Sequence, residues 1–179
     1  MVSGTRTALT GMTNVSAGED NTCATNRSGS MWCWGNNLLG QLSPLDLTTA
    51  KYGAVRSKFG NRSLMSGMQW IDLGSEHGCG VWKGYATCWG YNSEGQLGID
   101  STTLTTAPVA ALYESADGRV RQLTGITSIS GGFRHTCAVK NQTEVWCWGL
   151  NRNYQLGEGT INNRYTAYRV KKVGGGFFP

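Results

Sequence analysis

Gly132-Phe133-Arg134-His135-Thr136-Cys137, followed by Trp146-Cys147-Trp148-Gly149, is the stretch of sequence that decides the fold. Two earlier copies of the same motif lie at Gly18–Cys23 with Trp32–Gly35, and at Gly74–Cys79 with Thr87–Gly90. From copy to copy, the first cysteine moves by 56 and then 58 residues, and the second by 55 and then 59. A period of this size indicates stacked supersecondary units, which usually form a binding scaffold.

Each copy has the pattern of a small antiparallel sheet. In the third copy we expect strands over 126–130, 135–140 and 144–149, and a fourth over 165–173. Apolar and polar residues alternate in the first of them, and glycine or asparagine turns separate the strands. Four such strands form the blade of a β-propeller. The 26 glycines and seven tryptophans, without a sustained helical period, favour many short strands over helices.

The predicted fold class is all-β, with four-stranded antiparallel propeller blades over residues 12–69, 70–125 and 126–173. We interpret residues 1–11 as the tail of a preceding blade and residues 174–179 as a linker or docking tail. Propellers close with about four to eight blades, so three blades form an open arc or part of a larger ring. An open arc exposes apolar faces at both ends. We therefore expect a protein partner, further copies of the chain or other subunits to complete the ring.

The six cysteines all lie inside the repeats, and the members of each pair are ten, nine and ten residues apart. The pairs are Cys23 with Cys33, Cys79 with Cys88, and Cys137 with Cys147. Zinc sites usually place two ligands two to four residues apart, a spacing that these pairs lack. The pattern favours one disulfide in each repeat, with zinc ligation and free buried thiols as alternatives. Disulfides indicate an extracellular or secreted protein, at the cell surface or in a periplasm or secretory lumen. We expect no metal and no cofactor.

Side chains alternate between the two faces of a strand, so Cys147 should point away from the face that carries Trp148. We expect the tryptophans to pack between neighbouring blades. Leu97, in the second turn of its repeat, should fill the gap between blades. Gly149 ends the third strand at a sharp turn that often needs a positive φ. Tyr154 replaces a glycine of the earlier copies, so the backbone there either differs or accepts strain.

Basic residues concentrate between the tryptophan-glycine motifs and the next repeat. They are Lys51, Arg56, Lys58, Arg62, Arg119, Arg121, Arg164, Arg169, Lys171 and Lys172. Lysine and arginine on an outer strand discourage edge-to-edge pairing of sheets, which is our preferred interpretation. The alternative is an anionic partner, either a polysaccharide or, less favoured, a nucleic acid. The connections over 43–69 and 100–122 are long enough to hold the fourth strand and an excursion.

The turns before the second strands are the candidate protein-binding loops, because in a propeller they gather on one face. Their side chains are Glu19, Asp20, Glu76, Phe133 and Arg134.

His77 and His135 both lie two residues before a first cysteine, where the first repeat has Asn21. A residue that recurs with the repeat is most simply structural, and we expect these histidines to hydrogen-bond a turn. A catalytic role would need a partner at a fixed offset, and none repeats. The sequence also lacks a nucleophile elbow, a phosphate-binding loop and a calcium loop. We therefore expect no catalytic residue and no enzymatic activity.

The stretches His135-Thr136-Cys137-Ala138, Val145-Trp146-Cys147-Trp148-Gly149 and Gln155-Leu156-Gly157 resemble the regulator of chromosome condensation repeat family. The resemblance recurs three times over nearly the whole chain, and implies a propeller that usually has about seven blades. Cysteines at both paired positions are similar to those of the secreted, mostly microbial branch of the family. The best-known relative exchanges nucleotide on a small nuclear GTPase through a wedge, and no segment here matches that wedge.

The leading functional hypothesis is a non-enzymatic extracellular module that binds protein or builds an assembly. One alternative is a propeller regulator of a small GTPase or chromatin ligand, of the guanine-nucleotide exchange type. The other is a carbohydrate-binding propeller that uses exposed aromatic residues such as Tyr91, Tyr113 and Tyr154. We expect no membrane-spanning segment.

Overall fold

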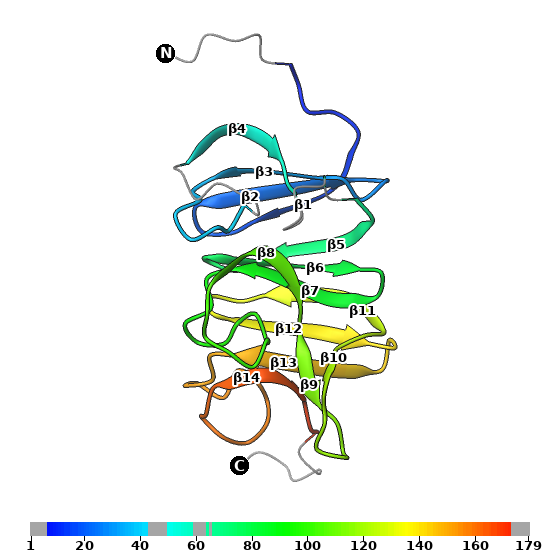
Figure 1. Cartoon of the computed structure of the whole chain (residues 1–179), viewed down its shortest axis with the longest axis vertical. Coiled ribbons are helices and arrows are strands. Elements are labelled where there is room, and N and C mark those ends of the chain that lie inside the picture. The colour runs from blue at the N-terminus through cyan, green and yellow to red at the C-terminus, as the bar shows by residue number, and fades with distance from the viewer. Residues whose placement is uncertain (1–6, 43–49, 59–63, 65, 173–179) are drawn as a thin grey trace, which may run out of the picture.

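The computed structural model describes residues 7–42, 50–58, 64 and 66–172, and its regular structure is entirely β. Three antiparallel blades lie one above another along the long axis (Figure 1). Blade 1 consists of β1 (Met12–Ala17), β2 (Asn21–Asn26), β3 (Met31–Gly35) and β4 (Lys51–Arg56). Blade 2 consists of β5 (Met68–Leu73), β6 (His77–Trp82), β7 (Tyr85–Gly90) and β8 (Thr105–Ala110). Blade 3 consists of β11 (Ile126–Gly131), β12 (His135–Lys140), β13 (Glu144–Gly149) and β14 (Arg164–Arg169).

The third sheet has two strands more than the four that the sequence predicts for a blade. The connection after β8 forms a hairpin of β9 (Leu112–Glu114) and β10 (Val120–Gln122), which pairs with blade 3 instead of blade 2. β9 joins β14 in parallel, through the pair Ala167 and Tyr113. Tyr113 also packs edge-on against Trp146, with ring centroids 5.2 Å apart. The excursion therefore fastens blade 2 to the outer edge of blade 3.

The predicted tail of a preceding blade, residues 1–11, lies partly outside the described residues, and its residues 7–11 contain no strand. The predicted linker over 174–179 lies wholly outside them, as does Arg62 among the predicted basic residues.

Each blade carries one disulfide across its two central strands. The bonds join Cys23 to Cys33, Cys79 to Cys88, and Cys137 to Cys147. Each pair is directly opposite in the register, with Cα atoms 4.0–4.1 Å apart. No free cysteine remains, because residues 59–63 and the other undescribed stretches contain none in the sequence.

The core lies between blades, because each sheet is apolar on both faces. The disulfide face of blade 1, with Met31 and Leu42, packs against Ile71 and Trp89 of blade 2. The disulfide face of blade 2, with Leu97, packs against Ile129 and Trp148 of blade 3 in the same way. Each interior tryptophan thus packs back onto the preceding blade, as its alternation with the cysteines predicts.

A polar contact accompanies each of these tryptophans. The indole Nε1 of Trp89 donates to the carbonyl oxygen of Gln41 at 2.9 Å, and Trp148 donates to that of Gln96 at 2.8 Å. Both rings are fully buried, so these hydrogen bonds satisfy donors that would otherwise be costly to bury.

The first strands of the blades lie side by side at the inner edge, where Asp72 links all three. Its carboxylate accepts hydrogen bonds from Ser16 of blade 1 at 2.6 Å and from Ser130 of blade 3 at 3.0 Å. The backbone N–H of Gly131 donates to the same carboxylate, and that of Leu73 donates to Ser16. The inner edge is therefore joined by side chains as well as by apolar packing.

Candidate binding surface on the blade turns

The turn between the first and second strands has the same construction in every blade. The N–H of its glycine donates to the carbonyl three residues on: Gly18 to Asn21 at 2.8 Å, Gly74 to His77 at 3.0 Å, and Gly132 to His135 at 2.8 Å. A Cβ at Gly74 would lie 2.1 Å from the His77 ring, so only glycine allows this histidine to fold beneath the turn. The turn is thus rigid. Ser75 is buried in the turn of blade 2, whereas Glu76 and the central residues of the other two turns are at least partly exposed.

The residue after each tryptophan-glycine motif lies beside this turn. The N–H of Tyr91 donates to the Glu76 carbonyl at 2.9 Å, and that of Leu150 donates to the Arg134 carbonyl at 2.8 Å. Gly149 has a φ of 100°, and a Cβ there would lie 2.6 Å from the Arg134 oxygen. The expected positive φ at this glycine therefore brings two distant segments to one edge of the blade.

Four side chains from blades 2 and 3 meet at this edge. The guanidinium of Arg134 lies 5.2 Å from the ring centroid of Tyr91 and 5.3 Å from that of Phe133. The same group is 3.4 Å from a carboxylate oxygen of Glu76. We call Glu76, Tyr91, Phe133 and Arg134 the turn cluster.

The turn cluster is fixed in place but open to solvent. The side chains of Arg134 and Glu76 are 30% and 31% exposed, and Phe133 is 59% exposed. The backbone N–H of Ser75 also donates to the Phe133 carbonyl at 3.3 Å, which ties the two turns together. Stacking on two rings and pairing with a carboxylate leave the arginine little freedom to lose when a partner binds.

The structure brings three of the five predicted loop residues together, namely Glu76, Phe133 and Arg134. Glu19 and Asp20 are exposed on the turn of blade 1. Tyr91 was expected only as a sugar-stacking residue, and its position directly after Gly90 was the signal for its place beside the turn. A neighbouring pair of loops is linked through Glu94, which is 3.7 Å from Arg152 and accepts a hydrogen bond from Asn163 at 2.6 Å.

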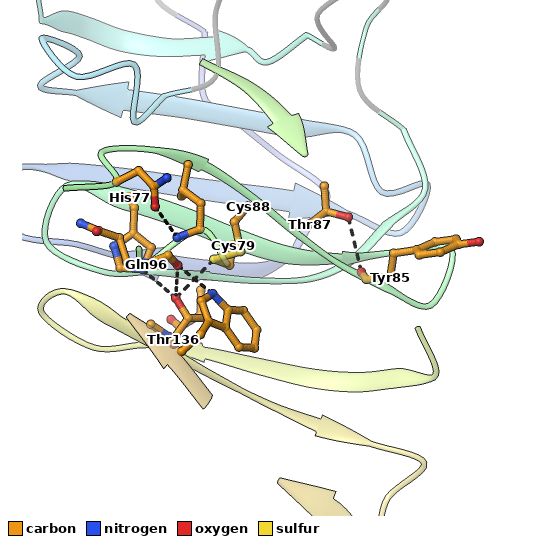
Figure 2. The surroundings of a disulfide bond; sticks show 12 residues. His77, Cys79, Tyr85, Thr87, Cys88, Gln96 and Thr136 are labelled. Carbon is orange, nitrogen blue, oxygen red and sulfur yellow. Dashed lines mark hydrogen bonds between the residues drawn. A yellow bond between two sulfur atoms is a disulfide. The ribbon is translucent and has the colours of Figure 1, made fainter. Parts of the chain in front are cut away.

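The two histidines occupy the same position but have different surroundings. The ring of His77 is fully buried, and its Nε2 lies 3.0 Å from the hydroxyl oxygen of Thr136 in the next blade (Figure 2). That hydroxyl donates its one hydrogen to the Gln96 carbonyl at 2.9 Å, so its oxygen accepts the hydrogen bond that the N–H of His77 Nε2 donates. The His77 ring thus bonds the neighbouring blade, whereas its backbone carbonyl closes the turn.

Burial lowers the pKa of His77 to about 4, assisted by the nearby His135 and opposed by Asp72. Burial also lowers the pKa of His135, which is only half-buried. Within the described part of the chain, no three or more histidine, cysteine, aspartate or glutamate side chains gather as a metal site would require. No helix in those residues is long and apolar enough to cross a membrane.

The basic residues of the outer strands are largely engaged by nearby groups. Arg169 lies 3.2 Å from Glu144, and Arg121 lies 2.8 Å from Asp117. Arg164 pairs with Glu158, whose pKa is held low by hydrogen bonds from Arg164 and Thr160 although burial raises it. Tyr113 packs inside the blade contact described above, so it is not a free sugar-stacking ring.

The model of the regulator of chromosome condensation (RCC1) repeat matches residues 84–139, and a second model of that repeat matches residues 12–41 and 126–155. Together the matches cover more than half of the chain. The chain belongs to the RCC1 repeat family.

Known RCC1 repeat proteins are similar over most of this chain. The ultraviolet-B receptor UVR8 of Arabidopsis thaliana is 29% identical over 169 residues, which cover 90% of this chain and 35% of the receptor. Protein pim1 of Schizosaccharomyces pombe is 27% identical over 160 residues, which cover 85% of this chain and 30% of pim1. The chain therefore spans about a third of the length of these curated relatives.

The crystal structure of human WBSCR16 has the same fold. It superposes with a TM-score of 0.72 at 21% identity, covering 90% of this chain and 40% of that one. The likeness supports the assignment of the three sheets as propeller blades.

Proposed function

We propose that this chain is a non-enzymatic binding module that recognises a protein through the turn cluster and works in an oxidising compartment outside the cytosol. The observation that carries the proposal is Arg134, held between Tyr91 and Phe133 and paired with Glu76 at an exposed edge. Arginine and large aromatic residues are the side chains most enriched among binding hot spots. A partner that buries Phe133 would desolvate an arginine that is already in position.

Three disulfides support the choice of compartment. Structural disulfides persist where the environment is oxidising and are rare in the cytosol of most organisms. The compartment could be the cell exterior, the cell surface, a periplasm or a secretory lumen.

The chemistry of the turn positions that recur in the repeats supports a binding role over catalysis. His77 is sealed between blades and neutral at physiological pH, so it can neither reach a substrate nor exchange a proton with one. It serves instead to hold the turn of blade 2 against blade 3, and thereby to fix the turn cluster.

Binding can be tested with the whole chain immobilised and exposed to a cell-surface and secreted protein fraction from the same source. The variant Phe133→Ala should reduce retention of the captured partner at least ~10-fold, because it removes an exposed aromatic anchor. Tyr52→Ala is the matched control, since Tyr52 is 85% exposed on β4 and outside the turn cluster. Equal retention by all three proteins would overturn the assignment of the turn cluster.

The compartment is tested separately, by intact mass after alkylation of the chain isolated from its native source. Three disulfides should block alkylation of all six cysteines until a reductant is added. Alkylation of six thiols without reductant would overturn the proposed oxidising compartment.

A further inference from the structure

The two interfaces between blades have the same composition. Each is formed by the disulfide face of one blade, which we call the front half of the interface, and by the tryptophan face of the following blade, which we call the back half. The front half of a blade carries the disulfide and the cross-strand pair next to it, which is Thr25 with Met31 in blade 1 and Val81 with Ala86 in blade 2. The back half of the following blade carries an aliphatic residue of the first strand and the tryptophan of the third. These are Ile71 with Trp89 in blade 2, and Ile129 with Trp148 in blade 3.

Blade 3 has a front half of the same construction, and among the described residues no further blade packs on it, although Cys147 and Leu156 within it are already buried. Its cross-strand pair is Val139 with Val145. Val145 is 44% exposed, whereas the equivalent Met31 and Ala86 are 0% exposed. The partly exposed Cys137 belongs to the same face.

Blade 1 has the matching back half, and it too is open. Val15 is 66% exposed, whereas the equivalent Ile71 and Ile129 are only 2% and 3% exposed. Trp34 is partly exposed, although its counterparts in blades 2 and 3 are fully buried. One chain therefore presents both halves of an interface that it forms twice internally.

The polar groups of the two open halves also match. In the interior, His77 bonds Thr136, and Trp148 donates to the Gln96 carbonyl. At the open front of blade 3, His135 and Gln155 occupy the positions of His77 and Gln96. At the open back of blade 1, Thr22 and Trp34 occupy those of Thr136 and Trp148.

This match is better than the one inside the chain between blades 1 and 2. There, Asn21 faces the position held by Gly78, which has no hydroxyl, and the buried side-chain amide of Asn21 makes no hydrogen bond. The pair of His135 with Thr22 would instead repeat the His77 contact. Ser130 is likewise placed to accept the N–H of Ala17, as Ser16 accepts that of Leu73.

The two open halves lie at opposite ends of the arc, and both reach its inner edge. A hollow of about 380 Å³ beside the inner strands is lined by Val15 of blade 1 and by Val139 and Val145 of blade 3. First and last blades that border one hollow are arranged as in a segment of a ring.

We propose that a second copy of this chain docks here, with the back half of its blade 1 on the front half of blade 3. The contact joins unlike surfaces, and such head-to-tail contacts form rings when the rotation closes. Two copies supply six blades, within the four to eight that propellers use, whereas three copies would supply nine. The contact lies on the faces of the blades and borders the turn cluster at His135, and it is made by a second copy of the chain, so this proposal goes beyond the function proposed above.

Light scattering on the purified 179-residue chain, over a dilution series in the micromolar range, gives the first test. The expected mass is twice that of the 19.3 kDa chain. A mass of 19.3 kDa throughout the series would overturn the proposal, and would indicate that other blades or another protein cover these faces.

Two variants test the geometry. Val15→Asp and Val145→Asp should each weaken the dimer at least ~100-fold, because each buries an unpaired carboxylate in the contact. An equimolar mixture of the two should recover a dimer held by one contact, between the intact front half of Val15→Asp and the intact back half of Val145→Asp, whereas the second contact, which carries both carboxylates, stays open. A dimer formed by two like faces would survive one of the single variants, and that outcome would overturn the head-to-tail contact.

Two controls separate this result from folding and from a general effect of added charge. Both valines are exposed in the single chain, so the variants should keep the circular dichroism spectrum of the parent. Tyr52→Asp adds the same charge at a residue that is 85% exposed on β4, outside the two halves, and should leave the dimer within about twofold of the parent. A dimer lost in Tyr52→Asp would place the contact elsewhere and contradict the proposal.

Discussion

The front faces of blades 2 and 3 are almost the same surface in two different settings. Val81 and Ala86 of blade 2 are 1% and 0% exposed, whereas Val145 of blade 3 is 44% exposed. His77 is sealed, whereas His135 is half-buried. Burial of a position in this chain is therefore decided by the neighbouring blade more than by the strand that carries it. In repeat proteins, stability is the sum of each unit and its contacts with its neighbours, and this comparison isolates the second contribution.

The largest effect should come from removing a tryptophan at a covered face. Trp89→Ala deletes a fully buried ring and its hydrogen bond to Gln41, and should lower the free energy of unfolding by about 3–5 kcal/mol. Trp34→Ala, at the open back of blade 1, should lower it by only about 1 kcal/mol. Urea denaturation at a dilution where the chain is monomeric measures both. An equal loss of unfolding free energy in the two variants would show that Trp34 is as well packed as Trp89, and would contradict the difference between covered and open blade faces.

The next largest effect concerns pH and the sealed histidine. The pKa of His77 is about 4 in the folded chain, and its ordinary value of 6.5 applies to the unfolded chain. Between pH 4 and pH 6.5 the unfolded chain therefore binds a proton that the folded chain does not. The stability from His77 is thus complete above pH 6.5 and is lost as the pH falls toward 4. The cost of charging it there is about 3 kcal/mol.

His77→Asn tests this, because blade 1 already carries Asn21 at the same position. The variant should be less stable than the parent at pH 7, where the bond to Thr136 is missing, and should regain about 3 kcal/mol relative to the parent by pH 4. His135→Asn is the matched control at the half-buried position and should change the pH profile less. If both variants give the same profile, burial by blade 3 does not control the pKa of His77.

A third prediction separates loop length from burial. The disulfide loops of blades 2 and 3 span nine and ten residues, so loss of either bond should cost a similar amount, about 2.7 kcal/mol. Their rates of reduction should nevertheless differ. Cys79 and Cys88 are both 0% exposed, whereas Cys137 is partly exposed on the open face.

In the Val15→Asp variant, which keeps the front of blade 3 intact and open, a low concentration of dithiothreitol should reduce the bond of Cys137 and Cys147 first. Trapping with iodoacetamide and peptide mass analysis records the order. Simultaneous reduction of all three bonds would indicate global opening of the chain and would remove the distinction between the two faces.

Much of the fold could be predicted from the sequence because its signals are local and repeated. The predicted second and third strands of blade 3, 135–140 and 144–149, coincide with β12 and β13. Alternation along β13 also placed Cys147 and Trp148 on opposite faces, and Trp148 packs against blade 2 as expected. These features depend on residues close in sequence, and three copies of the pattern reinforce one another.

The parts that sequence did not predict depend on contacts between distant residues. The hairpin of β9 and β10 pairs with β14, whose residue Ala167 is far along the chain from Tyr113. Nothing in the sequence of the hairpin specifies that edge. Similarly, Phe133 and Arg134 could be identified as turn residues, but their meeting with Tyr91 requires the positions of two blades.

The smallest effect is expected at Tyr154, where the backbone of blade 3 matches the other blades although the residue does not. Its φ is 59°, beside 72° at Gly40 and 81° at Gly95. The chain thus keeps the left-handed turn and accepts the strain of a side chain there, about 1–2 kcal/mol. Tyr154→Gly removes that strain but frees the unfolded chain, so it should raise the free energy of unfolding by only about 0.5–1 kcal/mol.

The reverse change belongs in the same urea series. Gly95→Ala should be destabilising, because a Cβ at Gly95 would lie 2.5 Å from Tyr165 Cδ1 and 3.0 Å from Tyr165 Cα. Tyr154 is 62% exposed, so its ring contributes little packing to offset the strain. A loss of stability in Tyr154→Gly would therefore show that the left-handed turn costs tyrosine less than the freedom that glycine adds to the unfolded chain.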